Sequence, residues 1–130
     1  MVVAIVGNPK KMSRTRSAAE LMAEKLTGGP PKAVIEVAEI GPALLRWGDP
    51  AVAEAKKTVM EADALIVASP TYKATYTGLL KLFLDQFGQG ELGGIPTFPL
   101  MLGGSANHFL IKKIGQVNVR KWFVLLVLPS

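Results

Sequence analysis

Short apolar runs alternate along the chain with stretches in which apolar side chains recur every three or four residues. The first pattern is typical of strands buried on both faces of a sheet, and the second of helices that pack by one face. The strand-type runs are Met1–Val6, Ala33–Ala38, Ala64–Ala68, Thr97–Leu102 and Val119–Leu128. This alternation predicts an α/β domain built on a parallel sheet.

The segments between these runs carry the helical signals. We predict helices over Ser17–Leu26, from Asp49 to about Ala62, over Leu79–Phe87 and from about Asn107. In the first of them, the apolar face is formed by Ala18, Leu21, Met22 and Leu26. The second has the clearest beginning, because an Asp side chain caps free N–H groups and the following Pro50 fits the first turn.

Composition limits the classes of protein to which the chain can belong. Its 130 residues, 49% of them hydrophobic, suit one domain with a real core. The lack of cysteine excludes disulfides, a thiolate nucleophile and a cysteine-ligated metal. Val2–Val6 is too short for the apolar region of a signal peptide, and Trp122–Leu128 falls far below the roughly 18–20 residues of a membrane span. We therefore expect a soluble cytoplasmic protein that makes no membrane contact.

The net charge of +5 comes from two local clusters, in residues 10–16 and 112–121. Residues 17–109 contain all ten acidic side chains and only seven basic ones. A basic loop beside a helix start suits a small phosphate ligand, whereas a nucleic-acid-binding face more often carries a stripe of basic residues along one element. We therefore expect no nucleic-acid partner.

Three loops follow predicted strand ends, at Gly7–Thr15, Ser69–Thr77 and Gly103–Asn107. In parallel α/β sheets, ligands bind outside the carboxyl ends of the strands. These loops are therefore the candidate binding site.

The first loop has the chemistry of an anion site. The first N–H groups of a helix lack partners within it and favour negative charge, while Ser13 and Thr15 add hydroxyl groups and Lys10 and Arg14 add positive charge. Neither a Walker A sequence nor a Gly-x-Gly-x-x-Gly fingerprint is present. The alternative is a plain helix cap with solvated basic residues.

The other two loops carry weaker signals. Pro70 stiffens the second loop, so that Tyr72 is a candidate platform for a planar ring, although it also fits an ordinary rim position. Gly103 and Gly104 permit close backbone approach, as in many plain turns. His108 has no carboxylate or second ligand residue near it in sequence, which favours a structural or surface role.

The three loops together resemble the NAD(P)H-dependent FMN reductase family of flavodoxin-like proteins, which includes reductase partners of sulfonate monooxygenases. The first loop reads Gly7-Asn8-Pro9-Lys10-Lys11-Met12-Ser13-Arg14-Thr15, with Asn8 and Lys10 where the family has Ser and Arg. Residues Asp63–Lys81, which contain Pro-Thr-Tyr-Lys-Ala, are the most specific match. Gly103-Gly104-Ser105 matches the third loop, and the resemblance extends from Val2 to about Leu110.

The resemblance implies a binding role for each loop. The FMN phosphate would be held by Asn8, Lys10, Ser13, Arg14 and Thr15. The two edges of the flavin ring would be lined by Pro70, Thr71, Tyr72 and Lys73, and by Gly103, Gly104 and Ser105. No catalytic side chain is expected, because the flavin itself accepts the hydride from NAD(P)H.

The resemblance also implies an architecture and an assembly. We expect a flavodoxin-like three-layer sandwich with a parallel five-stranded sheet of order 2-1-3-4-5. The last helix of the family is expected to be missing, because Ile111–Ser130 departs from its pattern. An apolar segment left without cover favours a homodimer or tetramer, and the family suggests a monooxygenase as the partner enzyme.

Other functions fit the same fold. A tightly bound FMN that reduces a quinone, an azo dye or a metal oxyanion is the nearest alternative. A flavodoxin-type electron carrier usually has an acidic surface and a Thr/Ser-rich phosphate loop, which this chain lacks. A signalling receiver domain needs acidic residues where Gly7-Asn8 and Ser69-Pro70 stand.

Overall fold

A computed structural model describes residues 1–103 and, for the backbone, residues 124–127. The strands are β1 (Val2–Val6), β2 (Ala33–Glu36), β3 (Ala64–Pro70), β4 (Thr97–Gly103) and β5 (Val124–Val127). The helices are α1 (Arg14–Thr27), α2 (Val37–Ile40), the 3₁₀ helix η1 (Gly41–Leu45), α3 (Pro50–Met60) and α4 (Gly78–Leu84). The strands pair in parallel in the order β2-β1-β3-β4-β5. The predicted α/β class with a parallel sheet is confirmed.

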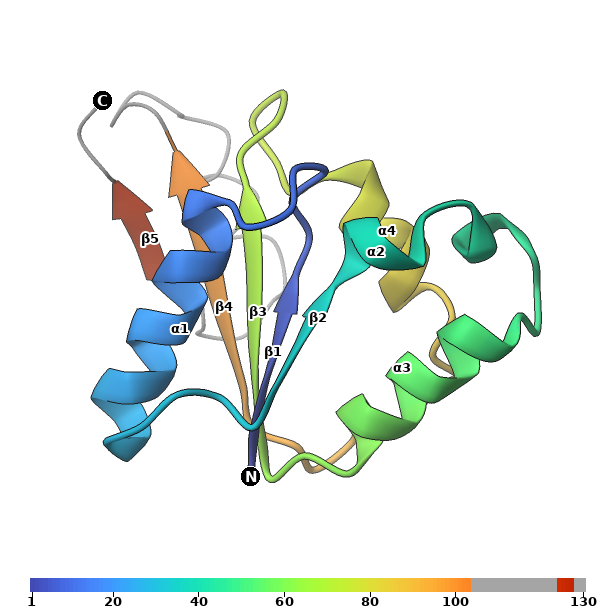
Figure 1. Cartoon of the computed structure of the whole chain (residues 1–130), viewed down its shortest axis with the longest axis horizontal. Coiled ribbons are helices and arrows are strands. Elements are labelled where there is room, and N and C mark those ends of the chain that lie inside the picture. Colours follow the sequence, from blue (N-terminus) through green and yellow to red (C-terminus); the bar gives the residue numbers. More distant parts are fainter. Residues whose placement is uncertain (104–123, 128–130) are drawn as a thin grey trace.

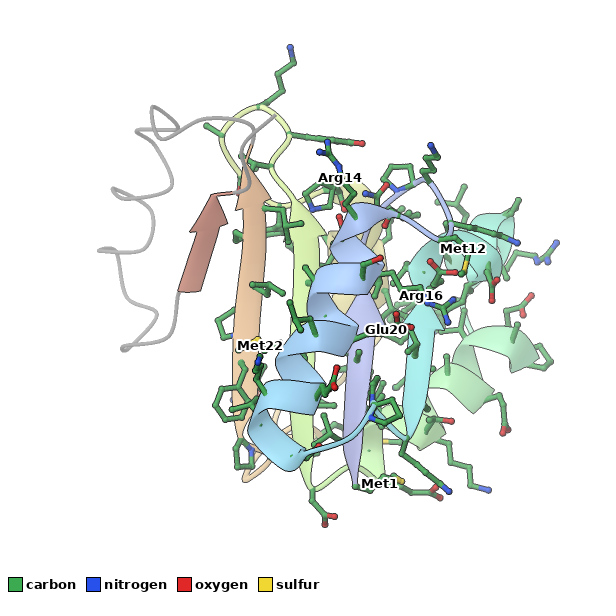
Figure 2. The ribbon with its side chains drawn as sticks, turned by 60° about the vertical axis from the view of Figure 1, so that its left-hand side comes forward. Met1, Met12, Arg14, Arg16, Glu20 and Met22 are labelled. Carbon is green, nitrogen blue, oxygen red and sulfur yellow. The ribbon has the colours of Figure 1, made fainter. Side chains whose placement is uncertain are left out.

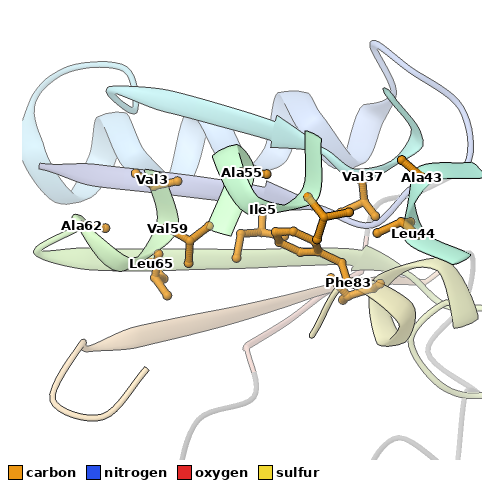
Figure 3. Close-up of a cluster of buried hydrophobic side chains, with 12 residues drawn as sticks. Val3, Ile5, Val37, Ala43, Leu44, Ala55, Val59, Ala62, Leu65 and Phe83 are labelled. Atoms are coloured by element: carbon orange, nitrogen blue, oxygen red, sulfur yellow. The ribbon is translucent and has the colours of Figure 1, made fainter. Parts of the chain in front are cut away.

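Helices cover both faces of the sheet (Figure 1). On one face, α1 packs its alanines against inward side chains of β1, β3 and β4. On the other face, α3 and α4 form a larger core with β1 and β3, together with α2 and η1 (Figure 3). Alternate residues of β1, such as Ala4 and Ile5, enter opposite cores, because successive strand side chains point to opposite faces. This burial on both faces explains the unbroken apolar runs of the sequence.

The predicted apolar face of α1 was partly wrong. Leu21 and Leu26 are about half exposed, and the buried contacts come from Ala18, Ala19 and Ala23. Small side chains let the helix axis approach the sheet closely, whereas leucines at these positions would hold it away. The helix also begins earlier than predicted, at Arg14, because Ser13 caps it.

The predicted end of the second strand was wrong, since the strand expected to reach Ala38 ends at Glu36. The chain turns there into two short helical segments, which place Val37 and Leu44 in the larger core. A positive φ of 54° at Gly41 allows the change of direction between them. The residues of this segment are therefore apolar because they pack against α4 in the larger core, and not because the strand is longer.

The predicted start of α3 is confirmed, because Asp49 accepts a hydrogen bond from the Ala51 N–H at 2.9 Å. This bond is also the main cause that lowers the pKa of the Asp49 carboxyl. In residues 1–103 and 124–127, no helix is long and apolar enough to cross a membrane. The helix predicted near Asn107, His108 and the ends of the strand predicted over Val119–Leu128 fall outside the described residues.

Candidate functional site

A cleft of about 510 Å³ lies where the carboxyl ends of β1, β3 and β4 meet. Its walls come from the β1–α1 loop with the start of α1, from the β3–α4 loop, and from the end of β4. The lining residues are Asn8, Lys10, Met12, Ser13, Arg14, Thr15, Pro70, Thr71, Tyr72, Leu102 and Gly103. Parallel pairing brings these loops together although they are far apart in sequence, as expected for an α/β sheet.

The β1–α1 loop is shaped by its own polar side chains. The Asn8 side chain accepts a hydrogen bond from the Lys10 N–H at 2.8 Å and donates one to the Thr15 hydroxyl at 2.9 Å. Ser13 caps α1 by accepting from the Arg16 N–H at 3.3 Å. The start of α1 therefore faces the cleft, where its free N–H groups favour an anion.

The basic residues of this loop divide into two groups. Lys11 pairs with Glu39 at 3.6 Å, and Arg16 pairs with acidic side chains on α1 and β2. Lys10 and Arg14 line the cleft and form no ion pair with the part of the chain that the structure describes. Figure 2 shows Arg14 at the start of α1, near the loop that follows β3. The cleft thus has two cationic groups available for a ligand.

The opposite wall is a tight turn. Tyr72 and Thr75 form a reciprocal pair of backbone hydrogen bonds, at 2.8 and 3.1 Å. Lys73 and Ala74 between them adopt positive φ values of 49° and 68°, a conformation that costs a non-glycine residue about 1–2 kcal/mol. The half-exposed ring of Tyr72 stands at the rim of the cleft. Strain of this kind is typical of loops that shape a binding site.

Thr71 lines the cleft with a buried hydroxyl that has no hydrogen-bond partner within residues 1–103 and 124–127. Its backbone is fixed, because its N–H donates to the Leu102 carbonyl at 2.8 Å. A buried hydroxyl without a partner costs about 1–3 kcal/mol, so the protein is stabilised when something bonds to it. This hydroxyl is therefore a candidate ligand contact.

Because the Thr71 hydroxyl is unpaired, we predict that its removal stabilises the protein. Thr71→Val, which keeps the shape and removes the hydroxyl, is expected to raise the free energy of unfolding of the ligand-free protein by about 1 kcal/mol. Urea denaturation measures the change. Thr97→Val is the matched control and should stabilise less, because the Thr97 hydroxyl already donates to Ile95 O at 3.1 Å. Destabilisation by Thr71→Val would show that the hydroxyl has a partner in the protein.

Gly7 and Thr77 hold the two walls together. The Thr77 hydroxyl donates to the Gly7 carbonyl at 2.5 Å and accepts from the Leu80 N–H at 3.1 Å, which caps α4. A Cβ on Gly7 would lie 2.6 Å from the Cβ of Leu80, so only glycine allows β1 to end this close to α4. Ser69 completes the junction by accepting the Thr77 N–H at 3.0 Å.

The structure brings together most of the residues that the sequence suggested. Those found in the cleft lining are Asn8, Lys10, Ser13, Arg14, Thr15, Pro70, Thr71, Tyr72 and Gly103. Lys73 is exposed at the turn and does not line the cleft, whereas Gly104 and Ser105 fall outside the described residues. Sequence reasoning missed Met12 and Leu102, since apolar side chains carry no chemical signal of a site.

Comparisons with known proteins agree on one family. The family model described as NADPH-dependent FMN reductase matches residues 1–130. FMN reductase (NADPH) of Escherichia coli strain K12 is 36% identical over 117 residues, which are 84% of this chain and 59% of that protein. The NADH-dependent FMN reductase SfnF of Pseudomonas fluorescens strain Pf0-1 is also 36% identical, over 85% of this chain and 63% of its own length.

A solved structure is similar as well. The apo form of the NADH:FMN oxidoreductase EMOB superposes with a TM-score of 0.80 and 38% identity, covering 97% of this chain and 73% of that one. Against the curated relatives the coverage is lower, because this chain spans about three fifths of their length.

Proposed function

Because the chain belongs to the NADPH-dependent FMN reductase family, we propose that it binds FMN in this cleft and reduces it with NAD(P)H. The observation that carries the proposal is the pairing of two opposite walls. One wall offers the start of α1 with Lys10 and Arg14, and the other offers the Tyr72 turn with an unpaired Thr71 hydroxyl. A ligand with a phosphate at one end and a flat polar ring at the other satisfies both walls.

The residues present fit FMN. The phosphate would be held by Asn8, Lys10, Ser13, Arg14 and Thr15, which supply charge, hydroxyl groups and free helix N–H groups. Thr71 would donate to or accept from a polar atom of the ring, which would relieve the cost of its unpaired hydroxyl. Tyr72 and Pro70 would lie along one edge of the ring, with Gly103, Gly104 and Ser105 along the other. Lys73 is proposed as a contact at the outer edge.

Hydride acceptance is the chemistry that a flavin supplies when bound. The protein has to orient the ring and stabilise the negative charge of its reduced form. Backbone N–H groups of the loops that flank the ring would do this without an acid or base. The half-exposed position of Tyr72 leaves the rim open, as a reaction with a nicotinamide on the exposed face requires.

The proposal is tested by measuring NAD(P)H oxidation with and without added FMN. The wild type should consume NAD(P)H only when FMN is present. Arg14→Gln should raise the KM for FMN about tenfold or more, because a charge-assisted hydrogen bond to phosphate contributes about 1.5–3 kcal/mol. Little change is expected in kcat, since Arg14 is placed at the phosphate and not at the ring.

Lys11→Gln is the matched control for Arg14→Gln. It removes the same charge from the same loop, but Lys11 pairs with Glu39 and does not line the cleft. Its KM for FMN should stay within about twofold of the wild type, the size of a screened surface effect. Failure of the wild type to bind FMN or to oxidise NAD(P)H would refute the proposal.

The oligomeric state, the partner enzyme and the cellular location of the protein are also proposed. Leu45 and Trp47 are exposed, with 81% of Trp47 accessible, and such apolar side chains favour a homodimer or tetramer. Light scattering tests this, and a well-folded monomer at high concentration would argue against it.

A monooxygenase that consumes the reduced flavin, and a cytoplasmic location, fit the family resemblance. A quinone, azo or metal-oxyanion acceptor would instead be favoured if the purified protein were yellow.

A further inference from the structure

Glu36 is a buried carboxylate beside the cleft but outside its lining. It ends β2, opposite Val6 of β1, and only 4% of it is exposed. A carboxylate buried to this extent is costly unless each oxygen has a partner. Both oxygens have one, since Oε1 accepts from the Met12 N–H at 2.9 Å and Oε2 accepts from Arg16 at 3.1 Å. Glu36 therefore joins the edge strand to the β1–α1 loop.

The bond to Met12 holds a strained part of the loop. Met12 has a φ of 49°, which a residue other than glycine adopts only when its surroundings impose it. Its side chain is largely exposed, so apolar burial does not fix this conformation. Ser13 follows it directly and caps α1 at the edge of the cleft. The Met12 sulfur also accepts a hydrogen bond from the Arg16 guanidinium at 3.1 Å. The bond to Glu36 is the one that holds the Met12 backbone itself, just before the start of α1.

The second oxygen of Glu36 forms an ion pair with Arg16. The Arg16 guanidinium bonds to Glu20 at 2.8 Å as well as to Glu36, and the hydrogen bond to Glu20 raises the pKa of Arg16. Figure 2 shows Arg16 and Glu20 along the side of α1, away from the Arg14 end. Arg16 is therefore neutralised within the protein and does not compete with Arg14 for a ligand.

We propose that Glu36 is a positioning residue for the phosphate loop, which holds the Met12 backbone so that the start of α1 faces an anion in the cleft. This inference rests on the proposed binding of FMN. It goes beyond it by giving a role to a residue that does not touch the ligand. Glu36 acts through Met12 and Ser13, which line the cleft, and does so with a carboxylate of the wrong charge for a phosphate site.

The charge of Glu36 makes the inference testable, because two explanations predict opposite signs. If Glu36 acted only as a nearby negative charge, its removal would tighten the binding of FMN. If it positions the loop, its removal weakens the binding of FMN in spite of the more favourable charge. Riboflavin, which lacks the phosphate, should be unaffected in the second case.

The test compares dissociation constants for FMN and riboflavin, measured by quenching of flavin fluorescence. Glu36→Met, which keeps the length and removes the acceptor, is expected to weaken FMN binding about tenfold and to leave riboflavin binding within about twofold. Glu36→Gln keeps an acceptor for the Met12 N–H and should recover most of the affinity. Glu39→Gln is the control, because Glu39 lies near the same loop but bonds to Lys11 and not to the backbone.

Amide hydrogen exchange without ligand gives a second readout. In the wild type, the Met12 amide should exchange about tenfold or more slowly than the Lys11 amide, and Glu36→Met should remove this difference. If Glu36→Met does not fold, the wild-type comparison still decides, since equal exchange at the two amides would overturn the inference. Equal or tighter FMN binding by folded Glu36→Met, or an equal loss of riboflavin, would also overturn it. A wild type that binds no flavin would refute the proposed function. The exchange experiment, which is done without ligand, would then still show whether Glu36 holds the Met12 backbone.

Discussion

Replacing Phe83 with alanine is expected to lower the free energy of unfolding by about 4 kcal/mol. Phe83 is fully buried in the larger core, where it packs with Val37 and Leu44 of the segment that follows β2 (Figure 3). Its ring also meets that of Phe87 edge to face, with centroids 5.3 Å apart. Alanine would lose these contacts and leave a cavity. Because small domains are stable by only about 5–15 kcal/mol, the loss is a large fraction of the total.

Urea denaturation measures this effect, and Leu82→Ala is the matched control. Leu82 is the neighbouring residue on α4 and is 39% exposed, so its truncation should cost less than about 1 kcal/mol. The variant of Phe83 should also loosen the junction between α4 and the 37–45 segment, as faster amide exchange there would show. Equal losses for the two variants would mean that α4 packs differently from the structure.

Thr77→Val is expected to cost about 3 kcal/mol, although it changes only one hydroxyl to a methyl group. The substitution removes the cap of α4, at about 1 kcal/mol, and leaves the Gly7 carbonyl without its buried donor, at about 1–3 kcal/mol. Only 2% of Thr77 is exposed, so water cannot replace the lost bonds easily. Differential scanning calorimetry or urea denaturation measures the loss.

Two control variants bracket this prediction. Thr77→Ser keeps the hydroxyl and should retain most of the stability. Thr58→Val removes a hydroxyl that only bonds back to Glu54 O within α3 at 3.2 Å, and should change the stability by less than about 0.5 kcal/mol. A Thr77→Val protein as stable as the wild type would refute the proposed link between β1 and α4.

The Thr77 junction also matters for the cleft. It fixes the end of β1 to the start of α4, so that the β1–α1 loop begins and the β3–α4 loop ends at this point. The Thr77→Val protein, where still folded, should therefore bind FMN more weakly. An unchanged affinity would mean that each loop is held independently of the other.

Much of the fold could be predicted because its signals are local. The unbroken apolar run of Met1–Val6 indicated a strand buried on both faces, and Asp49 with Pro50 marked the start of α3. The strand ends then placed the candidate loops at one edge of the sheet, where the cleft is found. The second strand was predicted two residues too long, and the helical segments up to Leu45 were missed, because a short buried apolar segment has the same pattern in a strand and in a helical turn.

The sequence by itself determined a parallel α/β domain, the edge of the sheet at which the candidate cleft lies, and the polar and basic residues of the first loop. Periodicity and caps encode these features among neighbouring residues. Only the tertiary structure decided that Lys10 and Arg14 face the cleft while Arg16 is neutralised, and that Glu36 holds Met12. It also decided that the buried hydroxyl of Thr71 has no hydrogen-bond partner among the residues that the structure describes. The physical reason is that charge pairing and burial depend on residues far apart in sequence, which meet only when the strands align.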